Sequence, residues 1–289
     1  MKKLLLLSGK GGTGKTTVSA ALIRLAQARA VADCDVDAPN LHLVTERRAE
    51  PERFDFFGGD KAAVDAQKCA GCGSCEAHCR FSAIAVREGR AAVNAYACEG
   101  CGVCALVCPH GAVTLKKDLA GRRELYKGGT VFSTAMLKMG RGNSGKLVTE
   151  VKLALLKAAP PCELAIVDGS PGIGCPVIAS VSGMDLVLVV AEPSGSGVSD
   201  LRRLVETAGT FRTKLAVCVN RWDVSPKHTA EIEAFCAARS IPFLGRIPFD
   251  PLAVRAANEG VSVVDMDCPA GRAVRDIYRE LRKLLELEE

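Results

Sequence analysis

The feature that most constrains this chain is a glycine-rich stretch at residues 9–17, GKGGTGKTT, which directly follows the apolar run Leu4–Leu7. It fits the phosphate-binding pattern G-x-x-x-x-G-K-[ST], and the run 18–30 after it favours a helix. Glycines let backbone N–H groups turn toward a polyphosphate, and a helix N-terminus adds partial positive charge behind it. An ordinary glycine turn is the alternative, but strand, complete motif and helix together favour a nucleotide-phosphate loop.

Residues of this loop are expected to contact both the nucleotide and Mg²⁺. Lys15 should reach the β- and γ-phosphates, and the Thr16 hydroxyl should ligate Mg²⁺. The residues predicted to bind the nucleotide here are Gly11, Gly12, Thr13, Gly14, Lys15, Thr16 and Thr17.

A second lysine, Lys10, stands inside the loop although Lys15 already supplies a point charge. With it, the stretch resembles the deviant Walker A motif, K-G-G-x-G-K-T, of the MinD/ParA/Mrp family, which includes the nitrogenase iron protein. The resemblance implies a homodimer that sandwiches two ATP molecules. Lys10 would then reach the partner subunit's phosphates and neutralise charge as the γ-phosphoryl leaves. A solvated loop lysine is the alternative.

Two buried strands are predicted to end in carboxylates. The run 31–40 carries Asp33, Asp35 and Asp37 on alternate residues, which would repel one another without a nearby cation. The resemblance makes this segment switch I, where Asp35 orients or activates the attacking water and Asp33 supports the Mg²⁺ shell. A polar strand end with capping acids is the alternative.

The run Leu164–Asp168 precedes Gly-Ser-Pro-Gly and resembles the family's Walker B and switch II region. The resemblance implies that Asp168 holds a Mg²⁺ water and that the Gly172 N–H senses the γ-phosphate. Cys175 follows Asp168 at the spacing of a cluster-ligating cysteine in the nitrogenase iron protein. Metal binding across a dimer is one interpretation of Cys175, but packing is favoured because no second cysteine matches it.

Eight of the fourteen cysteines form an internal repeat, C-x₂-C-x₂-C-x₃-C, at 69–79 and again 29 positions later at 98–108. The repeat resembles the two-cluster bacterial ferredoxin pattern, in which the fourth cysteine of each run ligates the other run's [4Fe–4S] cluster. The expected sets are Cys69, Cys72, Cys75 and Cys108, and Cys98, Cys101, Cys104 and Cys79. Zinc is disfavoured, since it prefers two well-separated C-x₂-C pairs. Arg80 replaces the proline that follows the second run as Pro109.

The remaining cysteines are expected to pack in the core: Cys34, Cys162, Cys218, Cys236 and Cys268. Fourteen cysteines without an export signal indicate metal or redox chemistry and a cytoplasmic protein, because disulfides belong to oxidising compartments. The start MKKLLLL imitates a signal peptide, but its apolar part is too short and runs straight into the loop.

Near position 220 the sequence Asn220-Arg221-Trp222-Asp223 overlaps two base-reading patterns. In MinD-like proteins an Asn here reads adenine, whereas guanine-specific GTPases use the Asp of N-K-x-D. Arg221 departs from that lysine, so ATP is preferred, and Asn220 and Arg221 are expected at the base. The stretch 247–251 resembles the family's late loop that closes over the adenine, which implies that Pro248 lies against the base.

These segments predict an α/β fold: a doubly wound, mostly parallel P-loop NTPase sheet with an inserted small α+β ferredoxin-like domain. The ATPase parts are expected at 1–60 and 118–289, and the insert at 61–117. Further expected elements are strands at 84–86, 91–93, 186–191 and 215–219, a hairpin at 122–133, and helices at 147–156, 197–207, 228–239 and 273–289.

The net charge of +5, from 38 Lys plus Arg against 33 Asp plus Glu, is too small to indicate nucleic-acid or membrane binding. The acidic end of the last helix also argues against an anionic lipid surface. The leading hypothesis is an ATPase whose switched dimer controls electron delivery from two clusters to a redox or metalloprotein partner. The alternatives are a cluster or metal carrier of Mrp type and a spatial organiser like ParA or MinD.

Overall fold

The computed structural model describes residues 1–43 and 50–287, which divide into two compact units. Unit 1 takes in the described residues of Met1–Arg53, Arg123–Met136 and Ser144–Glu289. Unit 2 consists of Phe54–Arg122 and Leu137–Asn143. Two long strands, β3 (Glu52–Val64) and β6 (Val113–Tyr126), carry the chain from one unit into the other.

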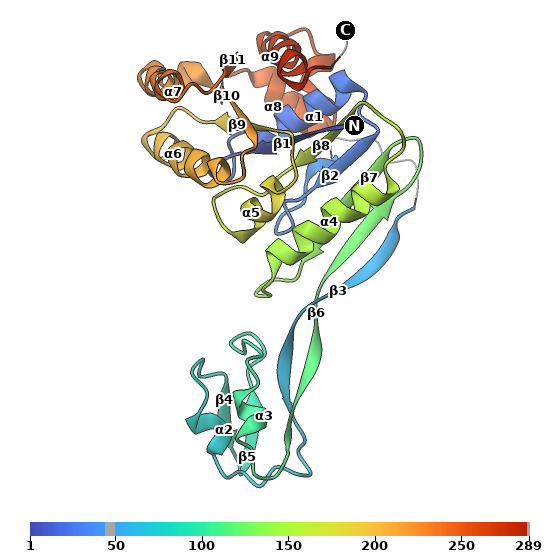
Figure 1. The fold of residues 1–289 in the computed structure, drawn as a ribbon, viewed down its shortest axis with the longest axis vertical. Coiled ribbons are helices and arrows are strands. Elements are labelled where there is room, and N and C mark those ends of the chain that lie inside the picture. Colours follow the sequence, from blue (N-terminus) through green and yellow to red (C-terminus); the bar gives the residue numbers. More distant parts are fainter. Residues whose placement is uncertain (44–49, 288–289) are drawn as a thin grey trace. The chain divides into compact units, whose positions relative to one another are not determined.

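The core of unit 1 is a parallel sheet (Figure 1), in which seven strands follow the order β11-β10-β9-β1-β8-β2-β7. β6 and β3 come next in the strand order, and a four-residue connection makes β6 and β7 an antiparallel hairpin, as predicted. The parallel strands are β1 (Lys2–Leu7), β2 (Ala30–Asp33), β7 (Val131–Leu137), β8 (Leu164–Asp168), β9 (Leu186–Ala191), β10 (Lys214–Asn220) and β11 (Phe243–Ile247).

Helices cover both faces of this sheet. Leu4 and Leu6 of β1 pack in one core with α1 and α9, while Leu5 and Leu7, which point the other way, are buried as well. Figure 1 shows α4, α5 and α6 in succession along the second face. The helices are α1 (Lys15–Ala26), α4 (Ser144–Ala158), α5 (Cys175–Val181), α6 (Gly195–Gly209), α7 (Pro226–Ala238), α8 (Pro251–Glu259) and α9 (Pro269–Leu285). The predicted mostly parallel α/β sheet is therefore confirmed.

Helix ends differ from the predictions. The helix expected at 273–289 begins at Pro269, because the Cys268 Sγ accepts the Gly271 N–H and proline suits the first helical position. It ends at Leu285, where Glu286 turns left-handed; residues 288–289 of the prediction lie outside the described residues. Its apolar side does pack on the core of unit 1, as expected. Among the described residues, no helix has the length and apolar character that crossing a bilayer requires.

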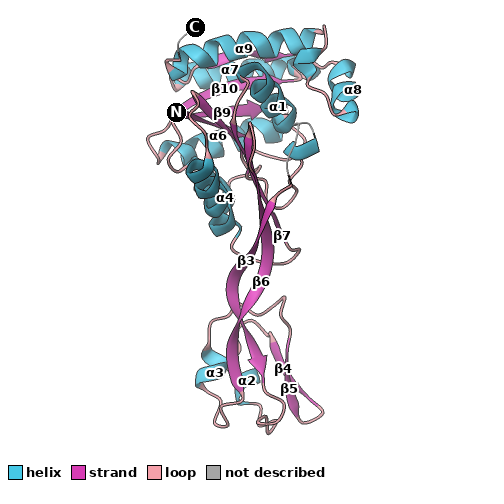
Figure 2. Ribbon diagram, turned by 90° about the vertical axis from the view of Figure 1, so that its right-hand side faces the viewer, coloured by secondary structure: helices cyan, strands magenta, loops and turns pink. Residues whose placement is uncertain are grey.

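Unit 2 is small and consists largely of strands and loops (Figure 2). β4 (Ile84–Arg87) and β5 (Arg90–Val93) form the expected antiparallel pair, and α2 (Ser74–Ala77) and α3 (Val103–Leu106) are single turns. Its buried cluster holds Ala62, Cys75, Ala83, Ile84, Cys98, Cys104 and Val113. Three of these seven are cysteines, so the apolar core of this unit is thin. The unit contains the whole 61–117 segment, while the three-part division into functional domains stays a prediction.

Candidate functional site

The glycine-rich loop connects β1 to α1, and Lys15 is the first residue of the helix. Gly12 and Gly14 adopt left-handed backbone angles, with φ of 78° and 88°. A Cβ on Gly14 would lie 2.2 Å from the Asn220 Nδ2, so this position requires glycine for two reasons. The α1 N-terminus is thereby directed at the space that the loop encloses, where its N–H groups favour an anion.

Asp168, at the end of β8, is the centre of a buried polar cluster. Its carboxylate accepts hydrogen bonds from the Lys15 Nζ at 2.7 Å, the Ser19 Oγ at 2.6 Å and the Thr16 Oγ1 at 2.9 Å. The Lys15 side chain is 5% exposed and that of Asp168 is 0% exposed. The structure thus brings the predicted phosphate-binding lysine, the predicted Mg²⁺ hydroxyl and the Walker B carboxylate together.

A second buried carboxylate, Asp33, lies beside Asp168. The two residues end adjacent strands and are paired in the sheet register. Asp33 accepts the N–H groups of Leu41 and Asp35, both at 3.0 Å. Burial and the charge of Asp168 raise the pKa of Asp33 from 3.8 to about 7. Burial also raises the pKa of the half-buried Asp35, whereas Asp37 is exposed.

Divalent cations fit the chemistry of this cluster. Asp33, Asp168 and the Thr16 hydroxyl are oxygen donors, and a cation would relieve the repulsion between the two carboxylates. No three Cys, His, Asp or Glu side chains among residues 1–43 and 50–287 converge as ligands of one ion. Mg²⁺ does not require such a set, because it is bound through one or two carboxylates together with substrate phosphates and water. Thr13, in the glycine-rich loop at 9–17, has a buried hydroxyl without a hydrogen-bond partner among the described residues.

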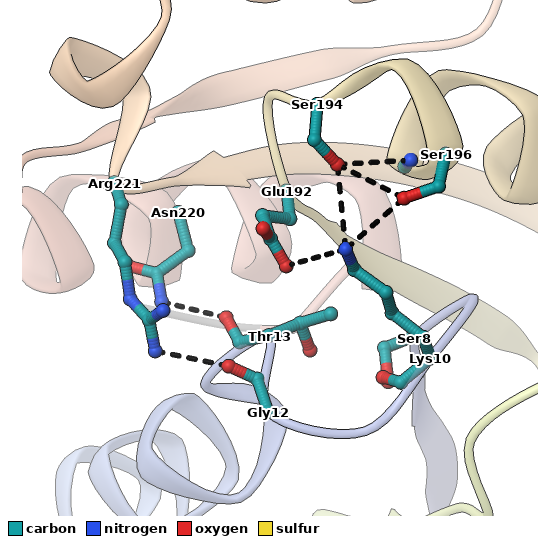
Figure 3. A network of polar contacts seen from close by, with 10 residues as sticks. Ser8, Lys10, Gly12, Thr13, Glu192, Ser194, Ser196, Asn220 and Arg221 are labelled. Carbon is teal, nitrogen blue, oxygen red and sulfur yellow. Dashed lines mark hydrogen bonds and ion pairs between the residues drawn. The ribbon is translucent and has the colours of Figure 1, made fainter.

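Lys10 lies on the outer side of the loop and contacts residues near the start of α6 (Figure 3). Its Nζ is 3.2 Å from a carboxylate oxygen of Glu192, and it donates to the hydroxyls of Ser196 at 3.2 Å and Ser194 at 3.4 Å. The lysine side chain is 36% exposed. Lys10 is therefore bonded to other residues of the same chain, and its partners differ from those of the cluster around Asp168.

The eight cysteines of the repeat line two pockets in unit 2. We call site 1 the pocket lined by Cys69, Cys72, Cys75 and Cys108, and site 2 the pocket lined by Cys79, Cys98, Cys101 and Cys104. These are the two groups that the repeat predicted, including the exchange of the fourth cysteine between runs. Among residues 1–43 and 50–287, the cysteines of neither site form a group of three or more that could hold one metal ion.

Backbone donors reach the sulfur atoms of both sites in matched pairs. The Ala91 and Ala112 N–H groups donate to the Sγ atoms of Cys69 and Cys108, at 3.4 and 3.3 Å. In site 2 the Ala62 and Ala83 N–H groups donate to the Sγ atoms of Cys98 and Cys79, again at 3.4 and 3.3 Å. Such donors stabilise thiolates, and the 29-residue offset that relates the runs also relates these bonds. The donor set fits thiolate-ligated clusters.

Comparisons with known proteins agree with the geometry of unit 1. A family model described as the CobQ/CobB/MinD/ParA nucleotide binding domain matches residues 4–263. The chain belongs to this family. It is similar to the solved structure of the cell division ATPase MinD from Pyrococcus furiosus, with a TM-score of 0.58 and 18% identity over 98% of this chain and 99% of that one. At that identity the likeness shows the fold.

Curated relatives match this chain to different extents. An uncharacterised protein of Methanocaldococcus jannaschii is 30% identical over 288 residues, covering 98% of this chain and 97% of the relative. An uncharacterised ATP-binding protein of the same organism is 27% identical, covering 95% and 85%. An iron-sulfur cluster carrier protein of Methanococcus maripaludis is 27% identical over 139 residues, which is 44% of this chain and 48% of the relative.

Two of the three residues expected at the base, Asn220 and Arg221, contact the glycine-rich loop directly. The Asn220 Nδ2 donates to the Thr13 carbonyl at 2.7 Å, and the Arg221 Nη2 donates to the Gly12 carbonyl at 2.9 Å (Figure 3). Pro248 is half-buried and follows β11. Asn220 and Arg221 thus fix the loop backbone, and their role at a base stays a prediction.

The segment that resembles switch II leads from Asp168 into α5. Gly172 has a φ of 94°, and its N–H donates to the Ser8 carbonyl at 2.9 Å, so in this structure the predicted phosphate sensor is bonded within the chain. Cys175 is the first residue of α5 and is exposed. Of the five cysteines expected to pack, Cys162 is only half-buried, and its Sγ lies 3.3 Å from the Met1 Sδ.

Sequence reasoning missed Lys152 of α4. The residue is only 7% exposed. Its Nζ donates to the carbonyls of Ala179, Ser180 and Ser182 at 2.6–2.7 Å. These carbonyls lie at the C-terminal end of α5, where the helix dipole favours a cation. Burial lowers the pKa of Lys152 to about 8. A lysine among apolar residues of a predicted amphipathic helix was the available signal. Through these hydrogen bonds Lys152 connects α4 to the C-terminal end of α5.

Proposed function

We propose that this protein is a Mg²⁺-dependent ATPase that controls electron delivery from two [4Fe–4S] clusters to a partner protein. Pairing of two subunits around ATP would switch the delivery on or off. The target would be a metalloprotein that is being assembled or reduced. The observation that carries the proposal is that one chain holds both a family nucleotide loop and two matched four-cysteine sites with N–H···S bonds.

At the nucleotide site, the residues around Asp168 would position phosphates and Mg²⁺. Lys15 and the N–H groups of α1 would hold the β- and γ-phosphates, and Thr16, Asp33 and Asp35 would support the metal shell. Because Lys15 is bonded to Asp168, nucleotide binding would redistribute the bonds of this buried pair. The raised pKa of Asp33 supports a cation here, since a cation would offset the burial and the charge of Asp168, which disfavour the ionised carboxyl. Asp35, at the half-buried end of the same segment, would orient the attacking water.

Lys10 would act in the neighbouring subunit's site. To reach it, its Nζ must leave Glu192, Ser194 and Ser196, all of them partly exposed groups whose bonds to lysine are weak in water. An ammonium delivered to the γ-phosphate would stabilise the charge that develops during its transfer. The pairing of two subunits and hydrolysis would then depend on the same side chain.

Adenine is the base that the site supports best. The Asp223 Oδ1 accepts the Phe249 N–H at 2.7 Å, so one oxygen that a guanine reader would use is already bonded. Asn220 and Arg221 are bonded to the loop, and together with Pro248 they would contact the adenine side of the nucleotide. The ATP-binding name of a relative that covers 95% of this chain agrees with this choice.

In unit 2, the cysteines of sites 1 and 2 would each hold one [4Fe–4S] cluster. A cluster bound there supplies one-electron transfer at low potential. The chain contributes four thiolates and two N–H···S bonds to each site, which disperse the negative charge of the sulfur atoms. Cys175 is given no ligand role, because it is a single exposed cysteine at a helix start.

A cluster carrier is the second candidate. The relative named as an iron-sulfur cluster carrier covers 44% of this chain and supports it. Complete sets of four cysteines favour tightly held clusters, which suit electron transfer better than donation. The two functions separate in a transfer assay: a carrier would rebuild an apo-ferredoxin at the expense of its own iron, and an electron-delivery protein would keep it. A spatial organiser rests on the shared fold alone.

The first test is chemical analysis of the anaerobically purified chain. Iron and acid-labile sulfide should each approach about eight per chain, the content of two cubanes, and the same preparation should hydrolyse Mg²⁺-ATP. Iron-free protein that refuses reconstitution, or protein without affinity for adenine nucleotides, would overturn the proposal.

A further inference from the structure

The offset of 29 residues that relates the two cysteine sites also pairs their surroundings. Ala62 and Ala91 are equivalent, since each donates its N–H to the first cysteine of a run, Cys98 or Cys69. Asp60 and Gly89 are equivalent too, because their carbonyls approach Gly100 and Gly71 in the same way. Lys61 in site 2 therefore corresponds to Arg90 in site 1.

This pair of basic residues breaks the symmetry. The Lys61 Nζ donates to the carbonyl of Cys98, a ligand of site 2, and the lysine is half-buried. Within residues 1–43 and 50–287, no carboxylate forms an ion pair with Lys61. Arg90 is exposed at the start of β5, where it pairs with Arg87 of β4. Site 2 thus has a partly desolvated positive charge against the peptide of a ligand, and site 1 has a solvated one.

Reduction adds one negative charge to a cluster, so a nearby cation stabilises the reduced form, and more so where water is partly excluded. We propose that Lys61 is a potential-tuning residue, which makes site 2 easier to reduce than it would be without this ammonium. The inference rests on the proposed function, because it requires a cluster in site 2. The charge of Lys61 opposes the effect of other side chains at site 2. Phe81 and Glu99 line site 2, and the corresponding residues at site 1 are His110 and Ala70. Apolar or acidic groups such as Phe81 and Glu99 disfavour the reduced state of a cluster.

The test is an EPR-monitored redox titration of the anaerobically purified full chain. Lys61→Met should lower one of the two midpoint potentials, changing the ratio of reduced to oxidised cluster at a fixed potential about tenfold, or 59 mV for a one-electron couple. Lys61→Arg, which retains the charge, and Arg90→Met, the symmetry-matched control, should each change it less than about threefold.

Lys61→Gln provides the same charge removal with a polar side chain, in case the methionine variant loses a cluster. Unchanged potentials in both neutral variants, or an equal shift in Arg90→Met, would overturn the role of Lys61 while leaving the proposed function standing. A chain that holds no cluster would instead refute the proposed function, and the two failures are told apart by the iron content of the unmutated protein.

Discussion

The nucleotide site draws its residues from across unit 1, whereas each cysteine site of unit 2 takes its ligands from two short, repeated runs. Asp33 and Asp168 meet because β2 and β8 are neighbours in a fully covered sheet, and their charges are buried. The cysteines are placed by local turns and by backbone N–H donors. One site depends on a large apolar core, and the other sites help to form a small one.

This difference separates the consequences of losing a ligand. Unit 1 contains a broad apolar cluster that includes strands, α1 and α9, so we expect its fold to be stable without a bound group. In unit 2, three of the seven buried cluster residues are cysteines that line the two sites. Metal binding to such a small unit contributes directly to its folding free energy.

The largest expected effect is therefore in unit 2. Cys75→Ala removes a ligand of site 1 and a buried core residue, so about half of the iron should be lost and unit 2 should become protease-sensitive. Iron analysis with limited proteolysis measures both, and unit 1 should stay resistant. Cys162→Ala, a half-buried cysteine outside the repeat, is the control and should retain all the iron. Retention of the full iron content by Cys75→Ala would contradict the dependence of site 1 on this cysteine.

Next comes the surface lysine of unit 1. Lys10→Ala should lower ATP hydrolysis about a thousandfold, as expected for a catalytic cation supplied by a neighbour, with little change in stability. Glu192→Gln is the matched change, because it removes the partner of Lys10 and should not lower the rate. Mixing Lys10→Ala with Asp168→Ala should restore part of the activity if Lys10 acts in the other subunit. A Lys10→Ala rate equal to the unmutated one would contradict this role.

The buried pair comes third. Asp168→Ala leaves the 5%-exposed Lys15 ammonium without its closest carboxylate, which should reduce the free energy of unfolding by about 3 kcal/mol. Urea denaturation without nucleotide measures it. Asp185→Ala removes the partly exposed partner of Lys3 and should cost less than about 1 kcal/mol. Equal losses in the two variants would show that Asp168 and Lys15 are not a buried pair in solution.

The smallest effect is a pH dependence. Because the pKa of Asp33 is raised to about 7, the folded chain binds a proton that the unfolded chain releases above pH 3.8, and nucleotide-free stability should fall as the pH rises through 7. Mg²⁺-nucleotide affinity should rise over the same range, since Mg²⁺ prefers the ionised carboxyl. Urea midpoints at pH 5 and 8 test the first statement, and Asp33→Asn should remove most of the slope. A slope that persists in Asp33→Asn would assign it to another group.

The sequence predicts the local patterns of both units but not the contacts between distant segments. The loop and the grouping of the cysteines follow from local patterns, a complete motif and an exact repeat. The sequence also predicts the strands that end in Asp33 and Asp168, each by itself, and the sheet register shows that they are neighbours. The contacts of Lys10 with Glu192, and of Asn220 with Thr13, join segments that no local pattern connects. Only the folded sheet specifies them.

Strand β3 shows a second limit. Its side chains are mostly exposed, so the sequence lacks the alternation of apolar and polar residues that predicts a half-buried strand. The thirteen-residue strand was therefore not predicted. Lys152 shows a third, because a lysine on a helix is ordinarily solvated, and only the carbonyls at the end of α5 explain its burial. The prediction for α9 placed its start late, since cysteine is not a usual N-cap residue.

In the proposed function, the nucleotide state of unit 1 governs electron transfer by unit 2. The most direct measurement follows the re-oxidation of dithionite-reduced chain by a redox protein captured anaerobically with a non-hydrolysable ATP analogue, using stopped-flow absorbance. We expect a rate that changes at least about tenfold with Mg²⁺-ATP, and the loss of that change in Lys10→Ala. Equal rates with and without ATP, in the unmutated chain and in Lys10→Ala alike, would contradict it.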